Sequence, residues 1–184
     1  MKTEKEALEI LKKYTTKPNL IKHAIVVGAV LKHFAQLQGE DAEYWNTVGL
    51  LHDVDYEMYP EEHCFKLVEI LKDEGFDDKF IRAIQSHGYE ICTDVEPISY
   101  MEKILCTIDQ LSGFIIACAL IRPEKKLEFV DLKSIHKRWK IPSFAAGTER
   151  GRIESQTTRW GLDFDYIATE TLKAMQAIAG DIGL

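Results

Sequence analysis

The feature that most constrains this chain is a set of four side chains of the kind that bind metal ions, carried on three segments with helical spacing. The pair His52-Asp53 ends an apolar run, 48–51, where an unpaired carboxylate would lose much of its hydration free energy. His23 and Asp109 lie in two other apolar segments. A divalent cation would offset that cost, because imidazole and carboxylate ligands together suit Mn, Fe, Co, Ni, Zn or Mg. If the three segments meet, the four side chains would occupy four positions of an octahedral ion. The remaining positions would be open to water and substrate.

Apolar residues recur at spacings of three and four along most of the chain, and strict alternation never persists, so the sequence predicts an all-α fold. With 184 residues and 46% hydrophobic content we expect a single domain, 1–184. In this helical bundle the ligand-bearing core spans about 19–122, and the C-terminal helices within 123–184 pack on it. The predicted helices cover 4–14, 19–38, 41–53, 60–75, 77–87, 98–120, 131–140, 148–160 and 164–179.

The order of these ligands resembles that of a known family. His23, then His52-Asp53, then a distant Asp109 is similar to the HD superfamily of metal-dependent phosphohydrolases, in particular its small single-domain HD/HDIG-type members. The similarity covers roughly residues 20–120. The motifs that carry it are Lys22-His23-Ala24, Leu50-Leu51-His52-Asp53-Val54-Asp55 and Ile108-Asp109-Gln110-Leu111. The resemblance implies an HD-type helical bundle in which the bound ion lowers the pKa of a water molecule and takes charge from a phosphoryl oxygen.

Two of the four ligands also have an ordinary structural interpretation. His23 could be a core histidine with a satisfied ring, and Asp109 could form a buried salt bridge with Lys103 or Arg122. Adjacent helical residues point about 100° apart, so His52 and Asp53 reach one ion only if the end of their helix directs its axis near the ion. Gly49, one turn earlier, would permit that close approach.

His63 and His87 allow three interpretations. They could bind a second ion, with Asp53 as the bridging carboxylate; they could contact the phosphate or donate a proton at a one-ion site; or they could be surface residues at helix ends. The two-metal branch of the resembled family often has a His-His pair where this chain has Ser86-His87, which weakens the case for a second ion. Asp55 could orient a ligating histidine or accept a proton from water. The candidate catalytic residues are Asp53, Asp55, His63 and His87.

Two segments outside this set suggest contacts with a phosphorylated molecule. The run 133–140 combines Lys and Arg with His136 and Trp139, and is either a solvated helix face or a docking site for a nucleotide or another subunit. The small-residue turn 143–147, followed by Arg150 and Arg152, would form a phosphate cradle if it folded over the metal site.

Charge and composition limit the partners that we expect. The chain has 23 basic and 30 acidic residues, a net charge of −7, which disfavours a nucleic-acid polymer or an anionic membrane as partner. A small phosphorylated substrate remains compatible, because a metal ion would supply the local positive charge. The sequence has no run of 18 apolar residues and no signal-peptide pattern, so we expect a cytoplasmic protein. Its four cysteines lack C-x-x-C spacing and are expected to be free.

Three functions are compatible with this pattern. The resemblance favours a metal-dependent phosphohydrolase that acts on a small phosphoester, a nucleotide or a dinucleotide in particular. The alternative is a sensor or interaction module that binds a nucleotide through the same metal without turnover. A metal-dependent oxygenase would need six ligands, and the Ser86 position argues against it. The sequence leaves open the substrate, the metal, the choice between one and two ions, and whether the protein forms oligomers.

Overall fold

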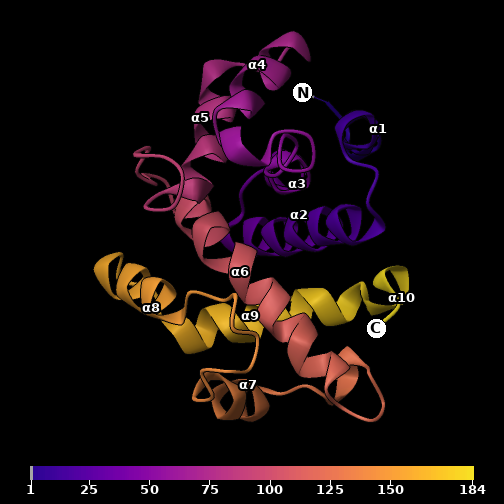
Figure 1. Ribbon diagram of the computed structural model, residues 1–184, viewed down its shortest axis with the longest axis vertical. Helices are drawn as coiled ribbons and strands as arrows, with labels where there is room; N and C mark the ends of the chain where they lie inside the picture. The colour runs from indigo at the N-terminus through magenta and orange to yellow at the C-terminus, as the bar shows by residue number, and fades with distance from the viewer. Residues whose placement is uncertain (1) are drawn as a thin grey trace. The chain divides into compact units, whose positions relative to one another are not determined.

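The computed structural model describes residues 2–184, and within them the secondary structure is helical without a strand (Figure 1). The predicted all-α fold is therefore confirmed. The α-helices are α1 Glu4–Tyr14, α2 Pro18–Gln38, α3 Ala42–Leu51, α4 Lys66–Asp73, α5 Asp78–Gln85, α6 Tyr100–Leu120, α7 Leu132–Trp139, α8 Arg150–Arg159, α9 Phe164–Ala177 and α10 Ala179–Ile182. Three short 3-10 helices are η1 Pro60–Glu62, η2 Ser86–Gly88 and η3 Leu127–Phe129.

Local capping explains where several of these helices begin. The side chains of Asp41, Asp77 and Asp163 each accept a hydrogen bond from a backbone N–H in the first turn of α3, α5 and α9. Thr3 and Glu6 form a reciprocal capping box at the start of α1. These caps satisfy backbone donors that a helix cannot pair internally, so the polar residue that precedes each apolar run fixes the boundary.

Backbone packing divides the chain into two compact units, Met1–Cys106 and Thr107–Leu184, with the boundary inside α6. The first unit contains α1 to α5 and the start of α6. The second contains the rest of α6 and α7 to α10. That the C-terminal helices within 123–184 pack on the ligand-bearing core to make a single domain stays a prediction.

In the first unit, α2 and α3 approach closely through two glycines. A Cβ atom added to Gly49 would lie 2.6 Å from the Gly28 Cα and 2.7 Å from its N, closer than real Cβ contacts allow. Val26, Val27 and Val30 of α2 and Val48 of α3 are fully buried around this crossing. The missing side chains let the two backbones touch, and this contact brings the N-terminal half of α2 alongside the C-terminal end of α3.

Two predicted helix boundaries in the first unit were wrong. Helix α3 ends at Leu51, so His52 and Asp53 lie in the turn that follows it. The predicted helix from Pro60 is interrupted after η1, because His63 adopts an extended ψ of 142° and Cys64 a left-handed φ of +70° before α4 begins. The interruption coincides with two hydrogen bonds to the buried Asp55 carboxylate, one from the His63 ring and one from the Leu67 N–H.

The second unit packs around aromatic rings and one arginine. The Arg150 guanidinium lies over the rings of Phe114 and Trp139, with distances of 5.1 and 5.7 Å to their centroids, and donates to the backbone oxygens of Phe144 and Ile141. Arg152 pairs with Glu149 at 3.0 Å. Both cations of the predicted phosphate cradle therefore have partners within the second unit.

Two helices, α2 and α6, are long and apolar enough to cross a membrane by length and composition alone. A core helix of a soluble protein meets the same criterion. In α6 the fully buried residues include Ile104, Leu105, Ile108 and Leu111, which is compatible with a core helix.

Candidate metal centre

Four imidazole side chains of the first unit, each from a different part of the chain, converge on the Asp53 carboxylate. His23 lies near the start of α2, His52 is the residue at the C-terminal end of α3, and Asp53 follows it. His63 comes directly after η1, and His87 lies within η2. The close contact between α2 and α3 brings the first two histidines together, and the irregular segments after α3 and α5 bring the other two.

The two oxygens of Asp53 face different pairs of imidazoles. Oδ2 is 3.4 Å from His52 Nε2 and 3.7 Å from His23 Nε2. Oδ1 is 3.4 Å from His87 Nε2 and 3.5 Å from His63 Nε2. We call His23, His52 and Oδ2 the first half-site, and His63, His87 and Oδ1 the second half-site. One carboxylate with a pair of nitrogens on each oxygen has the donor arrangement of a bridge between two cations.

Hydrogen bonds at the Nδ1 atoms of three imidazole rings direct the opposite nitrogens, Nε2, toward Asp53. His52 Nδ1 lies 2.7 Å from the Gly49 carbonyl oxygen, and His87 Nδ1 lies 2.7 Å from that of Ile84. His63 Nδ1 lies 2.8 Å from Asp55 Oδ1. All three partners only accept hydrogen bonds, so each Nδ1 carries the proton, and in a neutral ring each Nε2 presents a lone pair.

The second half-site therefore needs a positive centre. The Nε2 atoms of His63 and His87 are 3.2 Å apart, and in the neutral rings two lone pairs would face each other. A proton or a metal ion resolves this conflict. In the first half-site the Nε2 atoms of His23 and His52 are also 3.2 Å apart. Two metal–nitrogen bonds of about 2.1 Å that meet at about 100° span this distance, so both pairs fit a metal ion.

Burial and charge shift two pKa values in the cluster. Burial alone would raise the pKa of Asp53, but the imidazoles of His52 and His87 hold it well below its ordinary range. Burial would lower the pKa of His63, but the hydrogen bond to Asp55 and the charge of Asp53 together raise it. The carboxylate at the centre thus stays ionised, and the ring beside Asp55 holds a proton readily in the absence of another cation.

Asp109 belongs to α6 and lies one helical turn beyond Cys106, in the second unit. Its side chain is partly buried. That it acts as the fourth ligand stays a prediction.

Sequence reasoning missed a pair of thiols beside the second half-site. The Sγ atoms of Cys64 and Cys92 are 2.8 Å apart, and both cysteines are free, as expected. The hydrogen bond with Cys64 and the nearby imidazoles lower the pKa of Cys92 to about 6, against the effect of burial. A Cβ atom on Gly88 would lie 2.4 Å from each sulfur, so the glycine next to His87 makes room for both thiols. The 27 residues between the cysteines contain no motif that could have revealed this contact.

Two other polar residues near the ligands have structural roles. Ser86, which stands where the two-metal branch often has a histidine, donates its hydroxyl to the Ala83 carbonyl oxygen. Glu57, four residues after Asp53, accepts hydrogen bonds from the backbone N–H groups of Thr16 and Lys17 and from the Thr16 hydroxyl. Glu57 thereby ties the turn after α3 to the connection between α1 and α2.

Comparison with known proteins gives one match. Residues 20–113, just over half of the chain, match the model of a protein family described as the HD domain. Neither a curated protein nor a solved structure matches the chain. The matched range begins before His23 and ends after Asp109, so it contains all of the proposed ligands.

Proposed function

The chain belongs to the HD-domain family, and on this premise we propose that it is a metal-dependent phosphohydrolase. The proposed substrate is a small phosphoester, a nucleotide or a dinucleotide, because the net charge of −7 disfavours a polyanionic polymer. The proposed compartment is the cytoplasm, where a reducing environment keeps the four thiols free.

The observation that carries the proposal is the position of Asp53 between two pairs of imidazole nitrogens. We assign His23, His52, Asp53 and Asp109 to one ion. We assign His63, His87 and the second oxygen of Asp53 to a second ion. Bound ions would polarise a phosphoryl oxygen and make water a better nucleophile near neutral pH.

The protein residues prepare this chemistry by fixing the ligands. The Gly49 and Ile84 carbonyl oxygens hold His52 and His87 in the tautomer with a free Nε2. Asp55, fully buried, does the same for His63. Its second oxygen accepts a hydrogen bond from the Leu67 N–H, so the carboxylate cannot rotate away without the loss of a buried hydrogen bond.

If only the first half-site binds an ion, the role of His63 changes. Its ring, whose pKa Asp55 and Asp53 raise against the effect of burial, would then be the proton donor for the leaving group. The number of ions per chain decides between these two roles.

The test is metal analysis of the purified protein together with phosphate release from a panel of nucleotides, dinucleotides and phosphomonoesters. We compare the parent protein with Asp53→Ala and with Asp73→Ala, which removes an exposed carboxylate of α4. We expect Asp53→Ala to lose the bound metal and to reduce turnover by about 10³-fold or more, several kcal/mol of transition-state stabilisation. Asp73→Ala should retain both properties.

Two results would contradict the proposal. Turnover that survives in Asp53→Ala would remove the bridging role of this carboxylate and the mechanism with it. Bound metal without turnover of any phosphoester would favour the alternative function, a module that binds a nucleotide through its metal.

A further inference from the structure

The second unit contains a cationic hollow that the proposed function does not use. It has a volume of about 220 Å³ and is lined by residues from the end of α6 and from α7. Four of them are cationic, namely Arg122, Lys133, Lys137 and Arg138. The single carboxylate of the lining, Asp131, accepts a hydrogen bond from the Ser134 N–H as the cap of α7. The chain as a whole carries a net charge of −7, so the positive charge of this hollow is opposite in sign to that of the whole protein.

Arg138 lies over the Phe144 ring, 5.3 Å from its centroid, and none of the four cations has a close carboxylate partner within residues 2–184. Among residues 2–184, no carboxylate forms a salt bridge with Lys133, Lys137 or Arg138. The Nε atom of Arg122 is buried without a hydrogen-bond partner, and the nearest carboxylate oxygen, Glu124 Oε2, is 3.9 Å away. A buried guanidinium donor without an acceptor in the chain can bind an acceptor from outside it, either a water molecule or an anion.

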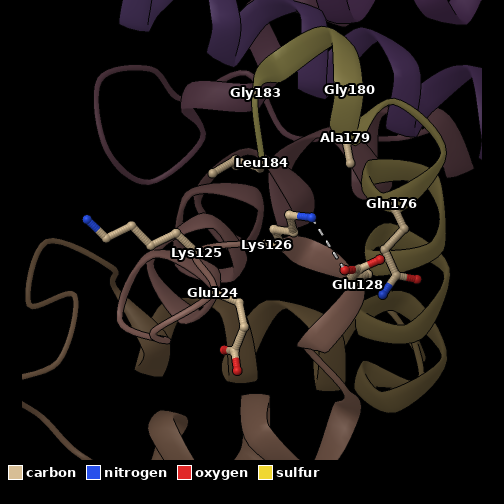
Figure 2. A pocket seen from close by; sticks show the side chains of 9 residues that line it. All are labelled: Glu124, Lys125, Lys126, Glu128, Gln176, Ala179, Gly180, Gly183 and Leu184. Carbon is tan, nitrogen blue, oxygen red and sulfur yellow. Dashed lines mark ion pairs between the residues drawn. The ribbon is translucent and has the colours of Figure 1, made fainter.

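A second hollow of the same unit provides a contrast (Figure 2). It is larger, about 770 Å³, and its charged lining residues are Glu124, Lys125, Lys126 and Glu128. Lys126 points toward Glu128, with 3.8 Å between Nζ and Oε1. Because its two lysines are balanced by two glutamates, this hollow has no net charge to attract an anion.

We propose that the cationic hollow binds a small oxyanion, namely inorganic phosphate or the phosphate group of a small phosphomonoester. The Arg122 guanidinium supplies a fixed donor, and Lys133 and Lys137 supply mobile charges one helical turn apart on α7. The volume corresponds to about seven water molecules at about 30 Å³ each, which accommodates one phosphate and part of its hydration shell. This site requires neither a metal ion nor the histidine cluster.

The experiment titrates inorganic phosphate into the metal-free full chain at constant ionic strength and follows binding by calorimetry and by the thermal midpoint of unfolding. Two double variants are compared with the parent, Lys133→Gln/Lys137→Gln in the cationic hollow and Lys125→Gln/Lys126→Gln in the balanced hollow. All four lysines are exposed, and each double variant removes two positive charges, so both change the net charge equally. Circular dichroism checks that both variants fold.

We expect one phosphate per chain in the parent, competition by sulfate but not by chloride, and at least tenfold weaker binding in Lys133→Gln/Lys137→Gln. Arg122→Gln should weaken binding to a similar degree, and the Lys125→Gln/Lys126→Gln variant should bind as the parent does. Absence of binding in the parent, or equal weakening in both double variants, would overturn the proposal. Binding that disappears in Asp53→Ala but persists in Lys133→Gln/Lys137→Gln would overturn it too, because the phosphate would then occupy the histidine cluster.

Discussion

The two half-sites share one carboxylate but are built in different ways. In the first, His23 lies on α2 and His52 directly follows α3, and the backbones of these two helices touch at Gly28 and Gly49. In the second, the histidines lie on a turn and a 3-10 helix, and a buried side chain, Asp55, orients one of them. Backbone packing thus positions the first pair and side-chain hydrogen bonds position much of the second. Different substitutions should therefore weaken metal binding at the two half-sites.

The largest effect should come from Gly49→Ala, which disrupts the helix contact beneath the first half-site. The added Cβ would meet the backbone of Gly28 at 2.6 Å, and a backbone atom cannot move aside as a side-chain end can. We expect a loss of more than about 3 kcal/mol in the free energy of unfolding, at the upper end of the effects of overpacking. Urea denaturation measures this loss, and metal analysis of the remaining folded protein should show weaker binding.

The matched control is Gly113→Ala in α6, where an added Cβ would meet no atom within 4 Å. Because alanine favours a helix over glycine, this variant should be more stable by up to about 1 kcal/mol. If both alanine variants changed stability by the same amount, helix propensity would explain the effect of Gly49→Ala, and the close contact would not matter.

The second half-site should respond instead to Asp55→Asn. Asparagine can still accept the hydrogen bond from the His63 ring, but its amide group would face the Leu67 N–H, and the negative charge behind the ring would be lost. Removal of such a partner of a ligating histidine typically weakens metal binding by about 10- to 100-fold. At limiting metal we expect the protein to change from two ions per chain to one, measured by mass spectrometry of the intact complex.

A control for the carboxylate-to-amide change itself is Glu57→Gln, since Glu57 is likewise a hydrogen-bond acceptor, with three donors, but lies outside the cluster. It should lower stability without a change in metal stoichiometry. Loss of both ions in Asp55→Asn would mean that the half-sites cannot fill independently, which would end the distinction between them.

The same contrast explains how much of this site could be predicted from the sequence. His23 lies in α2 and His52 directly follows α3, two helices that apolar periodicity predicts, and the predicted ranges of α1, α2 and α6 agree with the structure to within about two residues. The prediction of a continuous helix from Pro60 was wrong because apolar periodicity reports only local spacing. It does not show that Asp55, earlier in the chain, accepts hydrogen bonds from the His63 ring and the Leu67 N–H. The sequence also does not show which glycines make room for a neighbour. Gly49 makes room for the backbone of α2, and Gly88 makes room for two sulfur atoms.

Gly88→Ala tests the thiol pair beside the second half-site, with a smaller expected effect. The new Cβ would lie 2.4 Å from the sulfurs of both Cys64 and Cys92, so at least one thiol must move. We expect a loss of about 1–2 kcal/mol in the free energy of unfolding, since side-chain atoms can shift where a backbone cannot. The second substitution Cys92→Ala in this variant should restore part of the loss by removing one sulfur, and thermal denaturation of both variants measures it. No recovery in the double variant would show that the sulfur contact is not the cause.

The smallest effect should be a pH dependence whose sign depends on metal. His63 has a pKa raised above its ordinary value of 6.5, because its bond to Asp55 and the charge of Asp53 outweigh the opposing effect of burial. In metal-free protein the stability from the protonated ring is fully present below about 6.5 and is lost as the pH rises through the raised value. The low pKa of Asp53 lies below this window and contributes no slope there. Thermal midpoints of metal-free protein should therefore fall with rising pH.

Saturating metal should reverse that slope, because an ion competes with protons for the imidazole nitrogens and binds more tightly as the pH rises. An ion at 100 times its dissociation constant adds about 2.7 kcal/mol to the free energy of unfolding, so the reversal should be measurable between pH 6 and 8. Asp55→Asn should flatten the metal-free slope, since it removes the charge that raises the pKa of His63, while Glu57→Gln should leave the slope unchanged. Slopes of the same sign with and without metal would mean that the ion does not replace the proton at this ring, and the second half-site would then serve only as a proton-binding pair.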